Sequence, residues 1–300
     1  MFKINNSIIG KGHKPFIIAE MSGNHNQSLD RALELVDIAA QSGADAVKLQ
    51  TYTADTITFN GTNEEFQIKD NDSLWNNTNL YALYKQAYTP WEWHGAIFER
   101  ARKNGIIAFS SPFDESAVDF LESLNVPCYK IASFENTDHI LLKKVAQTGK
   151  PVIMSTGVAT IGDIQESLNV LRGNGCNNIV LLKCTSTYPA SPENTNILTI
   201  PHMRELYKCP IGLSDHTMGI GVSVASVALG ACIIEKHFTK SRAEGGVDSA
   251  FSLEPQELQA LVTESERAFL SLGEINYSLS EKEQKNLKFP VYHIIGNCFQ

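Results

Sequence analysis

The sequence predicts an α/β protein that is built as a closed (β/α)8 barrel, a TIM barrel. Short apolar runs rich in β-branched residues alternate with amphipathic stretches of helical spacing, a pattern typical of parallel sheets. Eight such runs occur, which is the number that this barrel requires. The predicted strands are Phe16–Ala19, Ala46–Leu49, Ile106–Phe109, Cys128–Ala132, Pro151–Met154, Ile179–Lys183, Ile211–Leu213 and Cys232–Lys236.

The stretches between the runs have the spacing of helices, and several end at a Gly just before the next strand, as helices often do. The predicted helices are Leu29–Gln41, Trp91–Lys103, Glu115–Leu124, His139–Gln147, Ile161–Gly173, Ile200–Leu206, Ile220–Leu229 and Pro255–Leu270. An open doubly wound sheet is the alternative, and it usually carries a GxGxxG turn after its first strand. This chain reads Glu-Met-Ser-Gly-Asn-His-Asn there, which favours the barrel.

Some segments fall outside this repeat. Residues 1–15 are expected to form a hairpin that plugs the bottom of the barrel, which would then span residues 16–275. Residues 276–300 are expected to be a linker or shortened tail. Residues 52–90 form a long polar connection with a helical piece at Leu80–Ala87, and connections of this length are usually lids or flexible segments. Because this one follows the second strand, we expect it to lie over the active face.

The composition suits a folded enzyme in the cytoplasm. Hydrophobic residues make up 43% of the 300 residues, enough for a sizeable core. The net charge of −8 argues against non-specific binding of nucleic acid. Neither an export signal nor a run of about 18 apolar residues is present, so no contact with a membrane is expected. The six cysteines form no CxxC pair and are expected to be free thiols.

Polar and ionisable residues gather where the apolar runs end. In a barrel these ends converge on one rim, where active sites lie. Capping of the following helices explains some Ser and Asp residues, but not lysines in or beside the barrel interior. The gathered residues are Glu20, Lys48, Gln50, Ser110, Ser111, Lys130, Ser133, Glu135, Ser155, Lys183, Thr185, Ser214, Asp215, His216, Glu235 and His237.

Lys48 and Lys130 need partners, because an unpaired buried ammonium is very costly. Three carboxylates could pair with them: Glu20, Glu135 and Glu235. The two lysines could equally hold a bound phosphate and carboxylate, and we favour this interpretation. Hydroxyls at strand-to-helix turns are common phosphate donors in barrels, and three lie nearby: Ser133, Ser155 and Ser214.

His216 and His237 end two successive predicted strands, so they should lie side by side on the rim. Two imidazoles with open positions suit a catalytic divalent ion such as Mn²⁺ or Zn²⁺. Asp248 follows them in the sequence, and His25 on the first loop could be a third ligand or a substrate contact. The alternative, that these histidines are structural, is left open by the spacing alone.

Long stretches of the chain carry signatures of a known family, and the match extends to about residue 280. They include IAEMSGNHNQSLDRAL at 18–33, KLQTYTADTIT at 48–58, YKIASFENTD at 129–138, STGVAT at 155–160, KCTSTYPASPENTN at 183–196, GLSDHTMGIGVSVA at 212–225 and EKHFTKSRAEGGVDSAFSLEP at 235–255. These stretches closely resemble the sialic acid synthase family. The EMSGNHNQS and SFENTD segments resemble its pseudaminic acid branch more than the sialic or legionaminic branches.

The resemblance implies a barrel that joins phosphoenolpyruvate to an open-chain N-acylated amino sugar with the help of a divalent metal, Mn²⁺ first and Mg²⁺ or Co²⁺ as alternatives. Family members form homodimers. By match to the motifs, His216 and His237 would be the metal ligands. The phosphoenolpyruvate site would comprise Lys48, Lys130, Ser133, Ser155, Ser186 and Ser214, with Ser186 standing where many members carry Asn. Glu135 would be the acid/base residue, and the sugar and metal-shell contacts would be Glu20, Gln50, Tyr188 and Asp248.

The resemblance also has a limit. Members normally continue through a Phe-Arg-Arg-Ser segment into a small antifreeze-like (SAF) domain, whose arginine reaches the neighbouring subunit's site. This sequence reads KNLKFPVYHIIGNCFQ up to residue 300, so we expect that domain to be missing and turnover to be weak, with metal binding retained. Two other classes stay open: a different aldolase or phosphoenolpyruvate-condensing synthase, and a non-catalytic homologue that only binds ligand.

Overall fold

The computed structural model describes residues 1–61, 63–69, 75–76 and 78–287. Eight parallel strands close into a barrel in which each strand lies beside its neighbours in the chain, which confirms the predicted fold. The barrel strands are β3 (Phe16–Glu20), β4 (Ala46–Thr51), β5 (Ile107–Pro112), β6 (Tyr129–Ile131), β7 (Val152–Ser155), β8 (Ile179–Cys184), β9 (Ile211–Asp215) and β10 (Ile233–His237). The ring is completed by parallel pairing of β10 with β3.

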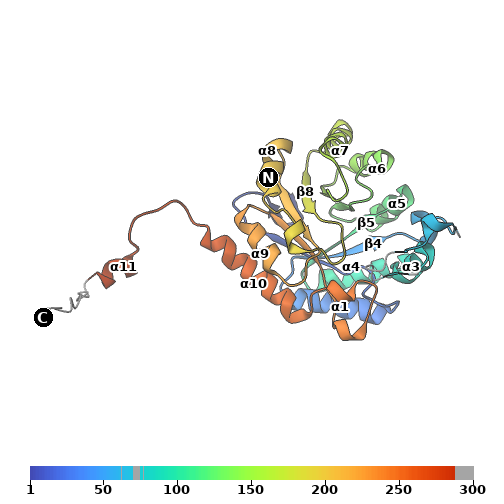
Figure 1. Ribbon diagram of the computed structural model, residues 1–300, viewed down its shortest axis with the longest axis horizontal. Coiled ribbons are helices and arrows are strands. Elements are labelled where there is room, and N and C mark those ends of the chain that lie inside the picture. The colour runs from blue at the N-terminus through green and yellow to red at the C-terminus, as the bar shows by residue number, and fades with distance from the viewer. Residues whose placement is uncertain (62, 70–74, 77, 288–300) are drawn as a thin grey trace, which may run out of the picture.

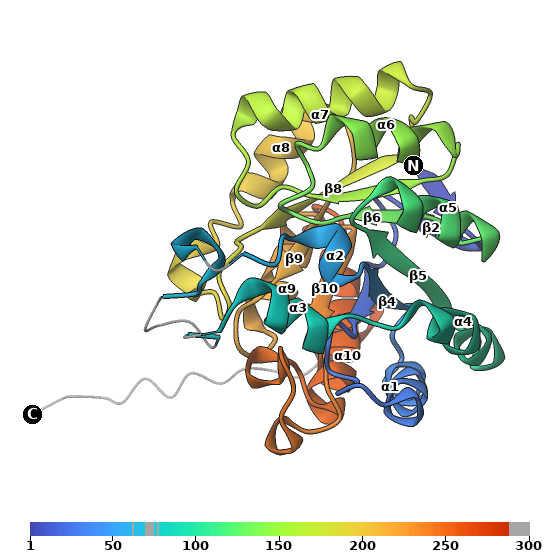
Figure 2. The ribbon, with the colours of Figure 1, turned by 90° about the vertical axis from the view of Figure 1, so that its right-hand side faces the viewer.

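Helices surround the strands on the outside of the ring (Figures 1 and 2). They are α1 (Leu29–Gln41), α4 (His94–Lys103), α5 (Glu115–Ser123), α6 (His139–Gln147), α7 (Ile161–Gly173), α8 (Thr199–Tyr207), α9 (Gly221–Ala228) and α10 (Pro255–Ser271). All eight were predicted, apart from small shifts at their ends. The largest shift is at Trp91–Trp93, which forms a separate 3₁₀ turn before α4. A short helix, α11 (Glu281–Asn286), lies away from the barrel in Figure 1.

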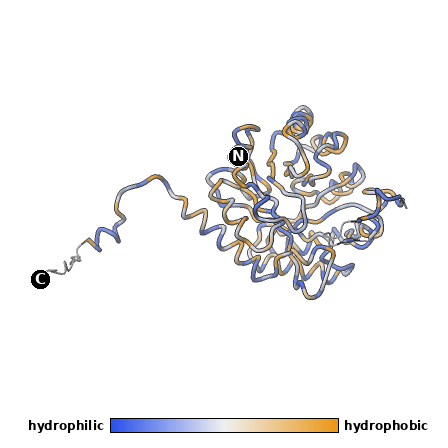
Figure 3. The backbone as a smooth tube through the Cα atoms, in the orientation of Figure 1, coloured by the Kyte–Doolittle hydropathy of each residue, from blue (hydrophilic) through white to orange (hydrophobic). Residues whose placement is uncertain are grey.

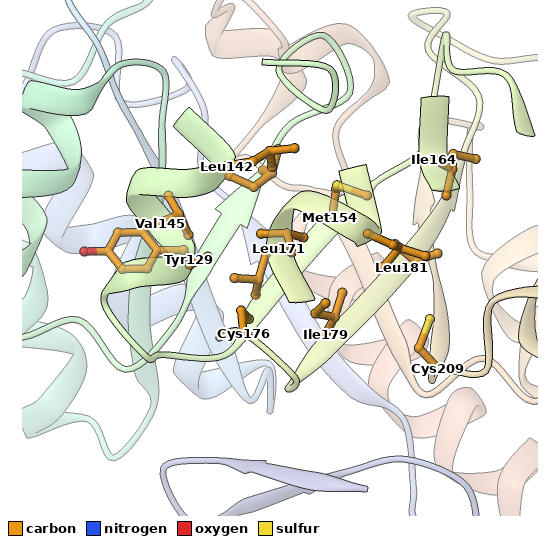
Figure 4. Packing of buried hydrophobic residues seen from close by; sticks show 14 of the residues in the cluster. Tyr129, Leu142, Val145, Met154, Ile164, Leu171, Cys176, Ile179, Leu181 and Cys209 are labelled. Carbon is orange, nitrogen blue, oxygen red and sulfur yellow. The ribbon is translucent and has the colours of Figure 1, made fainter. Parts of the chain in front are cut away.

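The helices bury one face each against the outer surface of the barrel. Orange and blue alternate within the helical coils of the tube in Figure 3, as they do when a helix has one hydrophobic and one hydrophilic side. Figure 4 shows the result on one side of the barrel, where helix residues such as Leu142 and Leu171 pack with strand residues such as Met154 and Leu181. This layer binds the helices to the sheet and supports the barrel from outside.

A second apolar layer fills the inside of the barrel at its bottom. It is closed by the hairpin of β1 (Phe2–Ile4) and β2 (Ser7–Ile9), whose Ile4 and Ile9 are fully buried. The residues that pack with them are Cys232, just before β10, and the inward-facing barrel residues Phe16, Ile18, Ala46, Phe109, Cys128, Ile153, Val180, Leu182 and Ile233. The hairpin therefore plugs the barrel, as the sequence predicted, and the interior below the mouth is solid.

Successive side chains on a strand point to opposite faces, so these inward residues define what the strands present at their carboxyl ends. The next inward side chains on four strands lie two residues beyond Ile18, Ala46, Cys128 and Ile233. These side chains are Glu20, Lys48, Lys130 and Glu235. The strands run one to three residues further than predicted at several ends, because their last residues face a polar mouth and break the apolar pattern.

Lys183 and Asp215 were grouped with the rim residues, and the structure corrects both. Each is next to an inward-facing residue, Leu182 or Ser214, so its own side chain points to the opposite face of the strand. The Lys183 ammonium donates to Thr185 Oγ1 at 2.9 Å, and Asp215 pairs with Lys236 outside the barrel. In the described part of the chain, no helix has the length and apolarity to cross a membrane. The five described cysteines are free, as expected, and Cys298 lies outside the described residues.

Replacing Gly212 with Ala is predicted to destabilise the barrel. Gly212 lies inside β9, where an added Cβ would come within 2.5 Å of the Ile233 carbonyl oxygen and 2.7 Å of a Leu182 methyl carbon. Backbone cannot move away cheaply, so we expect a loss of roughly 2–3 kcal/mol in the free energy of unfolding, measured by urea denaturation.

Gly221→Ala is the matched control. Gly221 begins α9, and an added Cβ would meet nothing within 4 Å among the described atoms. Because Ala favours helix more than Gly does, this variant should change stability by less than about 1 kcal/mol, toward greater stability. Equal stability of the two variants would contradict the packing described here.

Candidate active site

Two lysines and two glutamates form an ionic cluster across the mouth of the barrel. The Lys48 ammonium lies 2.5 Å from Glu20 Oε2 and 3.8 Å from Glu235 Oε2, and the Lys130 ammonium lies 3.2 Å from Glu235 Oε1. All four side chains are at most 6% exposed. Gln50 donates to Glu20 at 2.9 Å. The pairing with carboxylates that the sequence left open is therefore present.

Burial pulls the pKa values in this cluster in opposite directions. It raises the pKa of Glu20, against the effect of Lys48, and it lowers the pKa of Lys130 despite the attraction of Glu235. Burial also opposes ionisation of Glu235, but Lys130 and Lys48 outweigh it and lower the pKa of Glu235. Glu235 is thus the carboxylate that both lysines hold ionised. From the sequence it was one of the three carboxylates that could pair with these lysines.

A hydroxyl-lined cradle lies beside this cluster at the ends of β6, β7 and β8. An added Cβ on Gly157 would collide with the Ser186 hydroxyl and come within 2.7 Å of the Ser133 hydroxyl, so both hydroxyls face this glycine. We call Ser133, Gly157 and Ser186 the serine cradle. Ser155 is at the end of β7, and its buried hydroxyl has no hydrogen-bond partner among the described residues. These groups can donate to an oxyanion.

The two histidines expected to bind metal face each other at the ends of β9 and β10, next to the serine cradle, since the Cys184 thiol beside Ser186 lies 3.9 Å from His216 Nδ1. Their ring centroids are 5.4 Å apart, and Tyr188 lies 4.4 Å from the ring of His216. His216 Nδ1 lies 2.9 Å from the Thr185 carbonyl oxygen, a contact that directs Nε2 elsewhere. Phe251 packs against His237 at 5.0 Å and covers this side of the pair.

The donor set fits a divalent ion in part. Among the described residues, no group of three or more His, Cys, Asp or Glu is arranged to hold a metal. His237 Nδ1 is nevertheless buried with no hydrogen-bond partner there, 3.8 Å from Asp248 Oδ2. Asp248 also accepts a hydrogen bond from Ser22. Two imidazoles with a nearby carboxylate suit an ion that keeps positions open for water or substrate.

His25 is not available to such an ion. Its Nε2 lies 3.1 Å from Thr89 Oγ1, and its Nδ1 accepts from the Gln27 backbone N–H. Burial lowers the pKa of His25 to about 4, so the ring stays neutral. It joins the first loop to the segment before α4, and the suggestion of a third ligand or substrate contact was wrong.

Glu135 follows β6 and is largely buried. One of its carboxylate oxygens, Oε2, is buried without a hydrogen-bond partner among the described residues. Burial raises the pKa of Glu135 to about 7, although Lys130 and Lys48 act in the opposite direction. A carboxyl group with this pKa can give or take a proton near neutral pH.

The described part of the connection 52–90 reaches over the mouth, as predicted. It contains α2 (Ala54–Ile57) and α3 (Leu80–Ala87), while residues 62, 70–74 and 77 lie outside the described residues. The Trp75 indole N–H donates to the Val247 carbonyl at 2.9 Å, and its ring lies 6.0 Å from that of Tyr188. The connection is thus joined to the loop that carries Asp248.

Sequence reasoning missed Gly157 and Cys184. The Cys184 thiol lies 3.4 Å from Ser133 Oγ and 3.6 Å from Ser186 Oγ, inside the mouth. Cys184 is two residues beyond the inward Leu182, and this spacing could have identified it. Gly157 stood in the quoted STGVAT segment, but no sequence signal shows which side chains approach a glycine.

Comparisons with known proteins agree on one family. The NeuB family matches residues 35–277. A pseudaminic acid synthase of Campylobacter jejuni is 44% identical over 276 residues, covering 92% of this chain and 80% of that protein. An N,N'-diacetyllegionaminic acid synthase of the same organism is 40% identical over 277 residues, covering 91% and 82%. The crystal structure of an N-acetylneuraminic acid synthetase from Leptospira borgpetersenii has a TM-score of 0.84 and 33% identity, covering 96% of this chain and 95% of that chain.

Fold and mouth define a (β/α)8-barrel enzyme whose ionisable groups meet at the carboxyl ends of the strands. The chain belongs to the NeuB family. It is a carbon–carbon bond-forming transferase of the class that makes nonulosonic acids, the sialic acid type of sugar.

Gly157→Ala is predicted to remove anion binding with little loss of stability. A serine hydroxyl can rotate away from the new methyl group, and the Ser133 Cβ, 3.2 Å from it, needs to shift by only a few tenths of an ångström, so the fold should tolerate the change. The rotation takes both hydroxyls out of the serine cradle. We expect inorganic phosphate to raise the melting temperature of the wild type in a fluorimetric scan, and this shift to vanish in the variant.

Gly162→Ala provides the control for that measurement. Gly162 lies in α7, and an added Cβ would meet only Thr160 Oγ1, at 3.7 Å, among the described atoms. This variant should keep the full phosphate shift. A wild-type shift in Gly157→Ala would show that phosphate binds elsewhere.

Proposed function

We propose that this enzyme is a pseudaminic acid synthase. It condenses phosphoenolpyruvate with 2,4-diacetamido-2,4,6-trideoxy-L-altrose and water, and it releases pseudaminic acid and phosphate. The observation that carries the proposal is the ring of Lys48, Lys130, Glu135, His216 and His237 around one mouth. Pseudaminic acid synthases of Campylobacter jejuni and Helicobacter pylori, at 44% and 42% identity, support this choice of acceptor.

The proposed phosphoenolpyruvate site combines the lysines with the serine cradle. The substrate carries a phosphate and a carboxylate, and Lys48 and Lys130 are the cations buried closest to Glu235. Ser133, Ser155 and Ser186 would donate to the phosphate. Ser214 now donates to Glu235 at 3.0 Å, and it would turn to the ligand when the anion binds.

The proposed metal site is the pair His216 and His237, with Asp248 beside it. Mn²⁺ is the ion we expect, with Mg²⁺ and Co²⁺ as alternatives. A divalent ion bound there would act as a Lewis acid toward the aldehyde of the sugar. Tyr188, which packs on His216, would form a wall for the acceptor, and Gln50 and Glu20 would offer hydrogen bonds to its hydroxyls.

The proposed reaction forms a bond from C3 of phosphoenolpyruvate to the aldehyde carbon. The positive charge that develops at C2 is stabilised by nearby carboxylates such as Glu20 and Glu235, and water adds there before phosphate leaves. Glu135 moves the protons: it gives one to the new alkoxide and then takes one from the attacking water. Its pKa of about 7 suits both transfers.

The acceptor itself is decided by one assay. Phosphate release from phosphoenolpyruvate should be fastest with the diacetamido-trideoxy-altrose, and at least about tenfold slower with N-acetylmannosamine, because one misplaced contact costs about 1.4 kcal/mol or more. The alternatives are a legionaminic or N-acetylneuraminic acid synthase, which relatives with these names at 40% and 33% identity keep open. Faster release with the acceptor of either one would replace the proposal, and no release with any acceptor would favour a non-catalytic homologue.

Glu135→Gln should lose turnover but keep binding. The amide preserves size but cannot transfer a proton, so we expect kcat to fall by about 10²–10⁴-fold while the KM for phosphoenolpyruvate changes little. Glu166→Gln, on the outer helix α7, is the control and should be fully active. Normal turnover in Glu135→Gln would remove Glu135 from the mechanism.

The pH dependence gives a second test of Glu135. The residue begins the cycle protonated, and its pKa of about 7 lies above the ordinary value because it is buried. Raising the pH through about 7 removes that proton, so kcat should fall across this range and stay high below it. A profile of kcat between pH 5.5 and 8.5 that rises through 7 would contradict this role.

A further inference from the structure

A buried ion pair lies directly behind the two candidate metal ligands, on the outer side of the barrel wall. Asp215 and Lys236 are opposite each other in the register of β9 and β10. Each immediately precedes one of the histidines, His216 and His237. The Lys236 ammonium lies 3.0 Å from Asp215 Oδ2, and the two side chains are 1% and 0% exposed.

This pair holds the backbone on both sides of His216. The backbone N–H and the hydroxyl of Thr217 donate to Asp215 Oδ1 at 2.9 and 2.8 Å. The Lys236 ammonium donates to the Thr217 carbonyl at 2.5 Å. Because Asp215 and Thr217 flank His216, one network restrains the main chain before and after this imidazole.

The same network connects the two strands to helix α9. The Ser223 hydroxyl, which is fully buried, donates to Asp215 Oδ2 at 2.6 Å. The paired register of β9 and β10 runs from Leu213 and Ile234 up to Asp215 and Lys236, and the histidines come next. This outward pair is therefore the last paired position of β9 and β10 before the two imidazoles, and it joins the strands from which the rings project inward.

Stability alone is a poor explanation for such a pair. Removing two charges from water is expensive, and apolar residues of similar volume often stabilise a fold as well or better. Groups outside the ligand shell that orient metal-binding histidines, by contrast, typically change metal affinity by about 10–100-fold.

We propose that Asp215 and Lys236 are positioning residues for a divalent metal. They hold His216 and His237 at the separation that the ion needs, and they act through the backbone without touching the ion or the substrate. The inference rests on the proposed function, because it takes these two histidines as the ligands.

The test is a titration of the full chain with Mn²⁺, followed by electron paramagnetic resonance of the free ion. Asp215→Asn keeps the shape of the side chain but loses the charge that holds Lys236. We expect its Kd for Mn²⁺ to rise by about 10–100-fold. The melting-temperature shift caused by inorganic phosphate without metal should stay at the wild-type value, since neither Asp215 nor Lys236 belongs to the serine cradle.

Leu121→Ala is the control for a general loss of stability. Leu121 is fully buried in α5, beside the strands that lie opposite β9 and β10 in the ring. Its replacement by Ala should lower the melting temperature without changing the Kd for Mn²⁺. Ser223→Ala removes a single donor to Asp215 and is the milder variant, to be used if Asp215→Asn does not fold. We expect it to raise the Kd by about three- to tenfold.

The outcomes separate this inference from the proposed function. Wild-type affinity in folded Asp215→Asn, or in Ser223→Ala where the first does not fold, overturns the positioning role alone. An equal loss of affinity in Leu121→Ala overturns it too, because the effect would then come from lower stability. If the wild type does not bind Mn²⁺, the metal assignment of His216 and His237 fails, and the inference fails with it.

Discussion

Two ammonium groups inside a barrel place the strongest constraint on this structure. Lys48 and Lys130 point into the same space, where water is largely excluded, and neither could stay charged there alone. Glu20 and Glu235 form ion pairs with the two lysines. Gln50 and Ser214 donate hydrogen bonds to the same carboxylates. The result is a polar mouth above a solid apolar interior that the N-terminal hairpin closes from below. The positive charges of the lysines are already balanced by these carboxylates. An anionic substrate that enters the mouth would replace the carboxylates as the partner of the lysines.

The two-residue period of the strands divides the chemistry between two faces. Residues of one parity meet in the mouth, where Ser214, His216, Glu235 and His237 lie. Residues of the other parity, such as Asp215 and Lys236, lie against the helices and form a second polar network. The mouth offers binding groups, and the outer network restrains the strands that carry them. Glu135 and the serine cradle come from the loops after β6, β7 and β8, and Cys184 joins the cradle to the histidines, because its thiol lies 3.6 Å from Ser186 Oγ and 3.9 Å from His216 Nδ1.

Most of the barrel could be predicted from the sequence, because both periods are visible in it: runs such as Ile211–Leu213 are apolar throughout, and helices such as His139–Gln147 have one apolar face. The rim residues could be predicted because all strands end at one place. The face of the strand to which each rim residue points was harder to predict. A shift of one residue moves every side chain to the other face, and the polar residues at the end of a strand do not show which face is buried. Lys183 and Asp215 were misplaced for this reason. His25 was misjudged because its partner Thr89 is far away in the sequence. The place of Gly157 between two serine hydroxyls could be recognised only from the three-dimensional path of the backbone.

The central claim is that the buried lysines serve an anion and are not needed for the fold. The affinity for phosphoenolpyruvate of the double variant Lys130→Met/Glu235→Gln, measured by isothermal titration calorimetry, tests it most directly. This replacement removes one ammonium together with the carboxylate that both lysines share, and it leaves Lys48 paired with Glu20, so the protein should fold with little change in stability. The account predicts that the Kd for phosphoenolpyruvate rises by about 100-fold or more, as expected for the loss of a charge-assisted contact of about 3 kcal/mol. A Kd within threefold of the wild-type value would contradict it.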